Sequence, residues 1–258
     1  MAAPETVTAP SLVGALKLAP QQHLRCDTCA VRHKAACGAL SETEIARINE
    51  IAHHKTLPPG HTILTDHGEM TFFANIISGV VKLTKTLMDG RQQIVGLQFA
   101  SDFLGRPFRT ESPYNAETVT EVHLCTYNKA QFERLVKEFE GLEHRLFQNT
   151  LDELDASREW MLLLGRKSAA EKIASFLLMV SKRMEMVGCH HQQKPSHPTF
   201  HLPLSRAETA DFLGLTLETV SRQISNLKVQ KVISLQGNRM ISILDPLRLA
   251  AMTEVEQE

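Results

Sequence analysis

Between residues 57 and 130, apolar and polar positions tend to alternate, and β-branched and aromatic residues are common. Successive side chains of a strand point to opposite faces of a sheet, so this pattern predicts short strands with one buried face. Asp89-Gly90 lies between two of these stretches and predicts a tight hairpin, because glycine tolerates positive φ. No helical stretches intervene, which favours an antiparallel roll. The expected strands lie within HTILT (61–65), FFANIISGVVKLTKTL (72–87), RQQIVGLQF (91–99) and ETVTEVHLCTYN (117–128).

From about residue 131 to 164 the pattern becomes helical. Alternating steps of four and three residues, starting at Glu143, define a coiled-coil seam over about three heptads. Such a helix could pack on its own domain or against a second copy of the chain. The acidic flank, which includes Asp152 and Glu159, favours a dimer seam whose edges face water. The expected seam residues are Phe147, Thr150, Leu154, Ser157, Met161 and Leu164.

A second helix is predicted over about 166–187, and a polar loop follows it. Four histidines of this loop and its surroundings could be metal ligands, but their irregular spacing and two intervening prolines favour an exposed loop. Cys189 opens this loop and is not expected to belong to a site. The histidines are His190, His191, His197 and His201.

The stretch LSRAETADFLGLTLETVSRQISNLK (204–228) predicts a helix-turn-helix. Ser205 and Glu208 form a capping box that starts a helix over about 206–213. Gly214 then suits the left-handed cap of a helix end, and Thr216 suits the N-cap of a second helix over about 217–228. The alternating run VISLQGNRMISI (232–243) predicts a short hairpin, the wing of a winged helix.

Glu218, Ser221 and Arg222 share one face near the start of the second helix. Recognition helices present such residues to base edges in the major groove. Arg222 can donate two hydrogen bonds to guanine, and Glu218 can accept one from cytosine. The alternative interpretation is a simple Glu–Arg pair on a helix surface, worth about 0.2–0.5 kcal/mol. The cap, turn and N-cap together favour DNA binding.

Length, composition and charge fit this arrangement. The chain has 258 residues and is 43% hydrophobic and 22% charged. No apolar run approaches the roughly 18 residues of a membrane span. Residues 166–250 carry twelve basic and six acidic residues, a net charge of +6, whereas residues 133–160 carry a net charge of −4. We therefore expect an α+β protein with four parts: a disordered leader (1–22), a cysteine segment with a β-roll (23–130), a dimerisation helix (131–165) and a DNA-binding domain (166–250).

Cysteines provide the candidate chemistry. Cys26, Cys29 and Cys37 follow one another closely in a basic stretch, and Cys125 lies in the last predicted strand. The amino terminus has no basic residue before Lys17 and no apolar core typical of a signal peptide, so a cytoplasmic location is expected, where disulfides are rare. Four thiolates could hold zinc. They could equally hold a [4Fe–4S] cluster, whose charge the neighbouring basic residues would offset.

The order of these parts, with EWMLLLGRKSAAEKIASFL in the long helix and ETVSR in the recognition helix, resembles the CRP/FNR family of transcription regulators. The cysteine set and LPLSRAETADFLGLTLETVSRQ resemble its oxygen-responsive FNR branch. The resemblance implies a cyclic-nucleotide-binding-like jelly roll, a long dimerisation helix and a winged helix-turn-helix. It covers about residues 23–250.

The resemblance also implies roles for particular residues. Cys26, Cys29, Cys37 and Cys125 would ligate an oxygen-labile [4Fe–4S] cluster that keeps a DNA-binding homodimer intact under low oxygen. Glu218, Ser221 and Arg222 match the positions that read a palindrome like TTGAT-N4-ATCAA. Asp89, Gly90 and Arg91 lie where the family contacts RNA polymerase.

Two positions depart from the family pattern. The Arg-Ser pair that grips a cyclic phosphate is missing, and Glu117-Thr118 stand near its place, so cAMP is not expected to bind. Ser157 occupies a seam position where the best-known member carries an aspartate, so repulsion between protomers would have to come from Asp155 or Glu159. A regulator that holds zinc or a small effector and does not sense oxygen is the alternative. No grouping of nucleophile and base indicates an enzyme.

Overall fold

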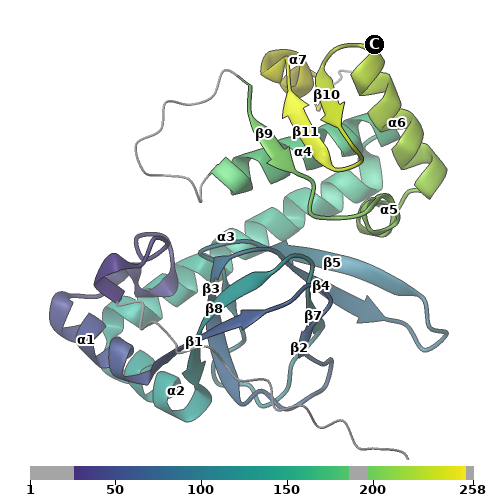
Figure 1. Cartoon of the computed structure of the whole chain (residues 1–258). Coiled ribbons are helices and arrows are strands. Elements are labelled where there is room, and N and C mark those ends of the chain that lie inside the picture. The colour runs from purple at the N-terminus through teal and green to yellow at the C-terminus, as the bar shows by residue number, and fades with distance from the viewer. Residues whose placement is uncertain (1–25, 186–196, 254–258) are drawn as a thin grey trace, which may run out of the picture.

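The computed structural model describes residues 26–185 and 197–253 (Figure 1). The expected leader (1–22), Cys189, His190 and His191 lie outside these residues. Figure 1 shows a β-roll below, a long helix running along it and a second domain above. Among the residues described, no helix combines the length and apolar character needed to cross a membrane.

The roll consists of two antiparallel four-stranded sheets, with strand orders β1-β8-β3-β6 and β2-β7-β4-β5. Their facing sides bury one core, which includes Phe73, Ile76 and Leu124. Thr86 pairs with Gln92 across the hairpin predicted at Asp89-Gly90, and Gly90 has the positive φ of 86° that the turn requires. The strands are β1 (Ala52–Leu57), β2 (Thr62–Leu64), β3 (Phe72–Ser78), β4 (Val81–Thr86), β5 (Gln92–Gln98), β6 (Phe103–Leu104), β7 (Asn115–Thr118) and β8 (Val122–Asn128).

The segment before the roll forms two 3-10 turns, η1 (Cys26–Thr28) and η2 (Ala36–Ala39), followed by α1 (Glu42–Ile51). Ser41 and Glu44 form a capping box at the start of α1. Val31, Ala35 and Leu40 are buried in the same core as the roll. The cysteine segment is therefore an integral part of the sensor domain.

The predicted helix of residues 131–165 is two helices in the structure, α2 (Lys129–Glu138) and α3 (Glu140–Arg166). The break falls at Phe139, whose backbone is extended (φ −111°, ψ 97°). Phe139 and Leu142 are both buried in the core of the roll. Burial of these two side chains turns the chain out of α2 and starts α3 on a new axis.

The upper domain matches the predicted winged helix-turn-helix. Gly214 ends α5 in the left-handed conformation (φ 62°), and the Thr216 side chain accepts a hydrogen bond from the Thr219 amide at the start of α6. The predicted wing is β10 and β11, and β9 adds a third strand to it. The elements are α4 (Ala169–Glu185), β9 (Thr199–His201), α5 (Arg206–Leu213), α6 (Leu217–Val229), β10 (Ile233–Gln236), β11 (Met240–Ile243) and α7 (Pro246–Ala251).

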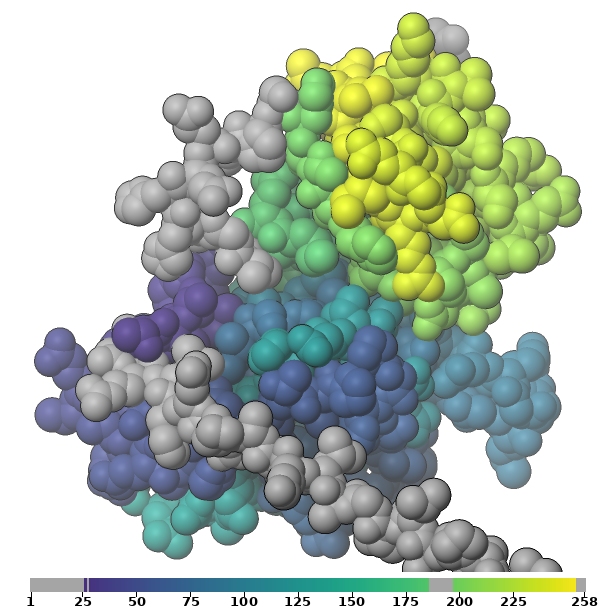
Figure 2. Space-filling model, viewed as in Figure 1, coloured from purple at the N-terminus to yellow at the C-terminus, as the bar shows by residue number. Residues whose placement is uncertain are grey.

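The two domains share buried surface. Val80, Ile94 and Phe99 of the roll belong to the same hydrophobic cluster as the cores of α4, α5 and α6. Polar contacts flank this cluster: Lys82 Nζ lies 2.9 Å from Glu208 Oε1, and Gln93 Nε2 donates to the Asp211 carbonyl at 2.7 Å. In Figure 2 the upper domain rests directly on the roll, as this shared core requires.

Candidate functional site

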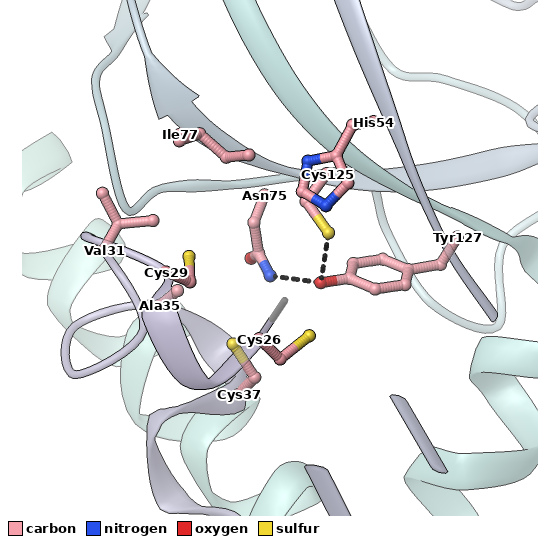
Figure 3. A pocket seen from close by; sticks show the side chains of 10 residues that line it. All are labelled: Cys26, Cys29, Val31, Ala35, Cys37, His54, Asn75, Ile77, Cys125 and Tyr127. Atoms are coloured by element: carbon pink, nitrogen blue, oxygen red, sulfur yellow. Dashed lines mark hydrogen bonds between the residues drawn. The ribbon is translucent and has the colours of Figure 1, made fainter. Parts of the chain in front are cut away.

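All four predicted cysteines line one cavity (Figure 3). Cys26 lies in η1, Cys29 follows it, Cys37 lies in η2 and Cys125 lies in β8. The fold thus brings the amino-terminal segment over the face of the sheet on which β8, an interior strand, presents its cysteine. The remaining lining residues are Val31, Ala35, His54, Asn75, Ile77 and Tyr127.

The sheet side of the cavity is built on one rung across three strands. Cys125 of β8 is in register with His54 of β1 and with Asn75 of β3. Tyr127 lies two residues further along β8 and so shares the face of Cys125. The Asn75 amide donates to the Tyr127 hydroxyl (Nδ2–Oη 3.0 Å), and the Cys125 thiol donates to the same oxygen (Sγ–Oη 3.2 Å).

Burial dominates the electrostatics of the cavity. Burial first, and then proximity to Cys29 and Cys26, raise the pKa of the Cys37 thiol to about 12, while Arg32 opposes the shift. Burial likewise raises the pKa of Cys125 to about 12. Thiols in such surroundings bind a metal only by releasing their protons to solvent. The positive charge of the metal must then replace the positive charge of those protons.

The spacing of the thiols bears on what they could hold. Among the described residues, no three His, Cys, Asp or Glu side chains are arranged to hold a single metal ion. A tetrahedral zinc with bonds of about 2.3 Å draws its sulfur ligands to roughly 3.8 Å from one another. Four cysteines around one cavity could supply four thiolates, either to a single zinc ion or to a [4Fe–4S] centre.

His54, Asn75 and Tyr127 were not predicted as part of this site. Their place depends on the register of β8 with β1 and β3, and β1 itself was not predicted. Tyr127 was the exception that the sequence could have revealed, because it follows Cys125 with the two-residue spacing of a common strand face.

The cysteine segment also contacts the start of α3. Arg145 Nη2 donates to the Lys34 carbonyl at 2.9 Å. Gly141 lies so close to η2 that an added Cβ would be 3.2 Å from the Ala39 carbonyl oxygen. A change in the segment that carries Cys37 therefore acts directly on the first turns of α3.

Most of the predicted seam on α3 faces solvent in the single chain. Phe147 and Met161 are 59% and 64% exposed, and Leu154 is 44% exposed. Thr150 and Ser157 are also exposed, and their hydroxyls donate to the carbonyls of Leu146 and Glu153. Only Leu164 is partly buried, against the core of the upper domain. Leu151 and Leu162 extend this apolar face.

The predicted base-reading face of α6 is open. Glu218, Ser221 and Arg222 are exposed, while Val220, Ile224 and Leu227 are buried. No ion pair joins Glu218 to Arg222 in the described part of the chain.

The β4–β5 hairpin projects from the roll and carries Asp89, Gly90 and Arg91 at its tip (Figure 2). Arg91 Nε lies 2.8 Å from Asp89 Oδ2, and all three residues are exposed. Leu87 and Met88 beside them are exposed apolar side chains.

Glu117 does not face the interior of the roll. It pairs with Lys82 at 3.0 Å, beside Glu208 of the upper domain, whereas its neighbours Ala116 and Thr118 are buried. Repulsion of a phosphate by Glu117 is therefore the wrong reason for expecting no cAMP, because the Glu117 carboxylate is directed to Lys82 and not to the interior of the roll. The expectation that cAMP does not bind stays a prediction.

Known proteins share this architecture and sequence. Residues 54–139 match the cyclic nucleotide-binding domain, and residues 171–252 match the Crp-like helix-turn-helix domain. The chain is 43% identical to the transcriptional activator protein FnrL of Cereibacter sphaeroides over 225 residues, which is 87% of this chain and 90% of FnrL. The chain belongs to the CRP/FNR family.

Other members of the CRP/FNR family agree with this assignment. The nitrogen fixation regulation protein FixK of Bradyrhizobium diazoefficiens is 36% identical over 90% of this chain and 95% of FixK. The structure of FixK2 from Bradyrhizobium japonicum superposes with a TM-score of 0.71 at 28% identity, over 80% of this chain and all of that one.

The family fixes the general activity. The chain is a transcription regulator that binds DNA through its helix-turn-helix, and its relatives are regulators and not enzymes. The relatives have names as different as FnrL and FixK, so membership does not by itself identify the signal.

Proposed function

We propose that this regulator senses oxygen through a [4Fe–4S] cluster bound by Cys26, Cys29, Cys37 and Cys125. The observation that carries the proposal is that these four cysteines, from the two ends of the sensor domain, line one buried cavity. When bound, the cluster would supply the oxygen-labile chemistry. The protein supplies four thiolates, a largely apolar lining and the nearby charge of Arg32.

The cavity is connected to the rest of the proposed mechanism by direct contacts. Cluster binding would hold the segment of Cys26–Cys37 against the roll, and this segment touches α3 through Arg145 and Gly141. The exposed apolar face of α3 is the proposed homodimer seam. Loss of the cluster would release the segment and weaken the dimer, which needs only a few kcal/mol of differential stability.

In the dimer, two α6 helices would meet half-sites about one helical turn apart. Arg222 and Glu218 would then read bases of a site like TTGAT-N4-ATCAA, and Ser221 lies between them on the same face. We also propose that the exposed tip at Asp89, Gly90 and Arg91 contacts RNA polymerase, since exposed apolar and charged side chains gather there.

The decisive experiment is anaerobic purification of the full chain, followed by a visible spectrum and by iron and sulfide assays. We expect about four iron and four sulfide per chain. Cys125→Ser should lose the cluster, whereas Cys189→Ser is the matched control and should keep it. A colourless protein with one zinc per chain would contradict the proposal.

DNA recognition is tested separately, with anaerobic protein and duplexes that vary one base of the TTGAT half-site. Arg222→Ala should lose discrimination at a guanine position by about 1–3 kcal/mol. Lys228→Ala, on the same helix but in its last turn, is the control. Unchanged preference among the duplexes would remove Arg222 from the assignment.

A further inference from the structure

Two buried polar side chains in the cysteine cavity form a hydrogen-bonded chain that ends on a proposed ligand. Tyr127 and Asn75 are 2% and 3% exposed. Figure 3 shows the Asn75 amide and the Cys125 sulfur converging on the Tyr127 hydroxyl within the space that the cysteines surround. Buried polar groups placed beside metal ligands commonly orient them and adjust their electron density.

The Tyr127 hydroxyl accepts hydrogen bonds but does not donate one to a described residue. The Tyr127 oxygen accepts from the Asn75 amide and from the Cys125 thiol, so both of its recorded bonds are accepted ones. Within the described part of the chain, no acceptor is recorded for the hydrogen of the hydroxyl itself. A hydroxyl has one donor and two acceptor positions. The donor of Tyr127 is thus unused in the thiol state.

Ligation changes the direction of the bond between Tyr127 and Cys125. Cysteine binds iron as a thiolate, which has no hydrogen to donate and is a good acceptor. At an Sγ–Oη separation of 3.2 Å, the hydroxyl can donate to that sulfur without moving. Asn75 can keep donating to the hydroxyl oxygen, which strengthens the donor through cooperative polarisation.

We propose that Tyr127 is a positioning residue that donates a hydrogen bond to the ligand sulfur of Cys125, and that Asn75 orients the hydroxyl. This inference rests on the proposed function. Hydrogen bonds to cluster sulfurs favour the more negatively charged, reduced state of an iron–sulfur centre. Tyr127 therefore makes the cluster harder to oxidise and slows its loss in oxygen.

The test uses the full anaerobic protein and Tyr127→Phe, which removes only the hydroxyl. Tyr114→Phe removes the other tyrosine hydroxyl of the chain, which lies outside the cavity lining, and is the matched control. We expect Tyr127→Phe to retain four iron per chain and to lose the cluster in air about tenfold faster. Its midpoint potential should fall by about 59 mV, the equivalent of a tenfold shift for a one-electron couple.

Asn75→Leu is the second variant, because it leaves the hydroxyl in place but removes its orienting donor. Like Tyr127→Phe, it should lower the midpoint potential and speed the loss of the cluster, but by smaller amounts. Tyr114→Phe should match the wild type in both. If Tyr127→Phe does not fold, Asn75→Leu decides alone.

The outcomes separate the two proposals. A wild-type protein without iron and sulfide contradicts the proposed function. If the wild type holds a cluster and Tyr127→Phe leaves its midpoint potential and rate of loss unchanged, the role of Tyr127 is overturned and the cluster proposal stands. Where only Asn75→Leu folds, the same result in that variant decides.

Discussion

Glu208 stabilises two structures at once. One carboxylate oxygen accepts the Ser205 amide at 2.9 Å and so caps α5, while the other lies 2.9 Å from Lys82 of the roll. Burial opposes its ionisation, yet the bonds from Ser205 and Lys82 outweigh burial and lower the pKa of Glu208 below its usual 4.5. A group whose pKa is lower in the folded state contributes stability above its unfolded pKa, and that stability is lost as the pH falls through the folded pKa.

We therefore predict that Glu208→Gln lowers the free energy of unfolding at pH 7 by about 1 kcal/mol, because glutamine can keep the capping bond to Ser205 but loses the charge that faces Lys82. The difference from the wild type should shrink as the pH falls below about 4.5. Urea unfolding at several pH values measures both effects. Glu218→Gln, an exposed carboxylate on α6, is the control. A difference that is independent of pH would contradict the role given to the ionised carboxylate.

At this scale the sequence identified residues whose signal is local. The four cysteines, the Ser205–Glu208 capping box and the Gly214 turn could all be predicted from neighbouring letters, and the structure contains each of them. The capping box at Ser41 and Glu44 carried the same signal and was overlooked. Asn75 and His54 could not be found, because only strand register places them beside Cys125.

Among the elements, α3 makes two kinds of contact, one with the cysteine segment and one proposed with a second copy. Two glycines of this helix separate local from tertiary effects. A Cβ added to Gly141 would lie 3.2 Å from the Ala39 carbonyl oxygen. A Cβ added to Gly165 would have no neighbouring atom within 4 Å. Both changes to alanine favour the helix by about 0.5–1 kcal/mol.

We predict that Gly165→Ala leaves the cysteine segment unchanged, whereas Gly141→Ala displaces it. Displacement of the segment should expose Cys37, which is buried in the wild type, and its thiol should then be alkylated faster. Mass spectrometry after timed exposure of the metal-free protein to a maleimide measures it. Equal rates in the two variants would show that η2 adjusts to the added methyl group without opening.

The exposed face of α3 makes a prediction about association. Met161→Glu places a charge in the seam, and desolvating it in a dimer is unfavourable. We expect this variant to sediment as a monomer at concentrations where the anaerobic wild type is a dimer. Asp152→Ala, an exposed position outside the seam, should not dissociate. Dimers of Met161→Glu as tight as those of the wild type would place the interface elsewhere.

The acids near Ser157 bear on how such a dimer would respond. Asp155, one of the two acids expected to supply repulsion, lies 2.8 Å from Arg158, so its charge is partly offset. An exposed pair of this kind is worth about 0–1 kcal/mol. Glu159, the other of the two acids, is exposed.

Elements were predictable where the pattern was long or the turn chemistry specific. The hairpin at Asp89-Gly90 and both helices of the helix-turn-helix lie where the sequence predicted them. Strands β1, β6 and β9 were missed. Strand β6 has only two residues, and β9 lies at the end of the stretch that was expected to be an exposed polar loop. The break at Phe139 was invisible to periodicity, since it arises from burial of that side chain in the roll.

We expect the whole molecule to unfold as a unit, because its domains share a core. Ile94 and Val95 are adjacent on β5, but Ile94 is buried against the upper domain and Val95 is exposed. We predict that Ile94→Asp separates the unfolding of the DNA-binding domain from that of the roll, giving two transitions in urea. Val95→Asp should keep the single transition of the wild type. A single transition in both variants would mean that the domain contact adds little cooperativity.

This docking could not be predicted from the sequence. The alternation along β5 identifies a buried face, but it does not say whether that face meets the roll's own core or another domain. The ties at Lys82–Glu208 and Gln93–Asp211 join residues far apart in the chain, and nothing in the local pattern marks them as partners.

The rung of His54, Cys125 and Asn75 also sets an order of events during biosynthesis. Translation delivers Cys26, Cys29 and Cys37 first, but Cys125 reaches its place only when β8 inserts between β1 and β3. The site stays incomplete until this last strand of the roll has been made and paired. A centre that needs all four thiolates can therefore be completed only after β8 has been made and paired, and a metal-free chain precedes it in the life of every molecule.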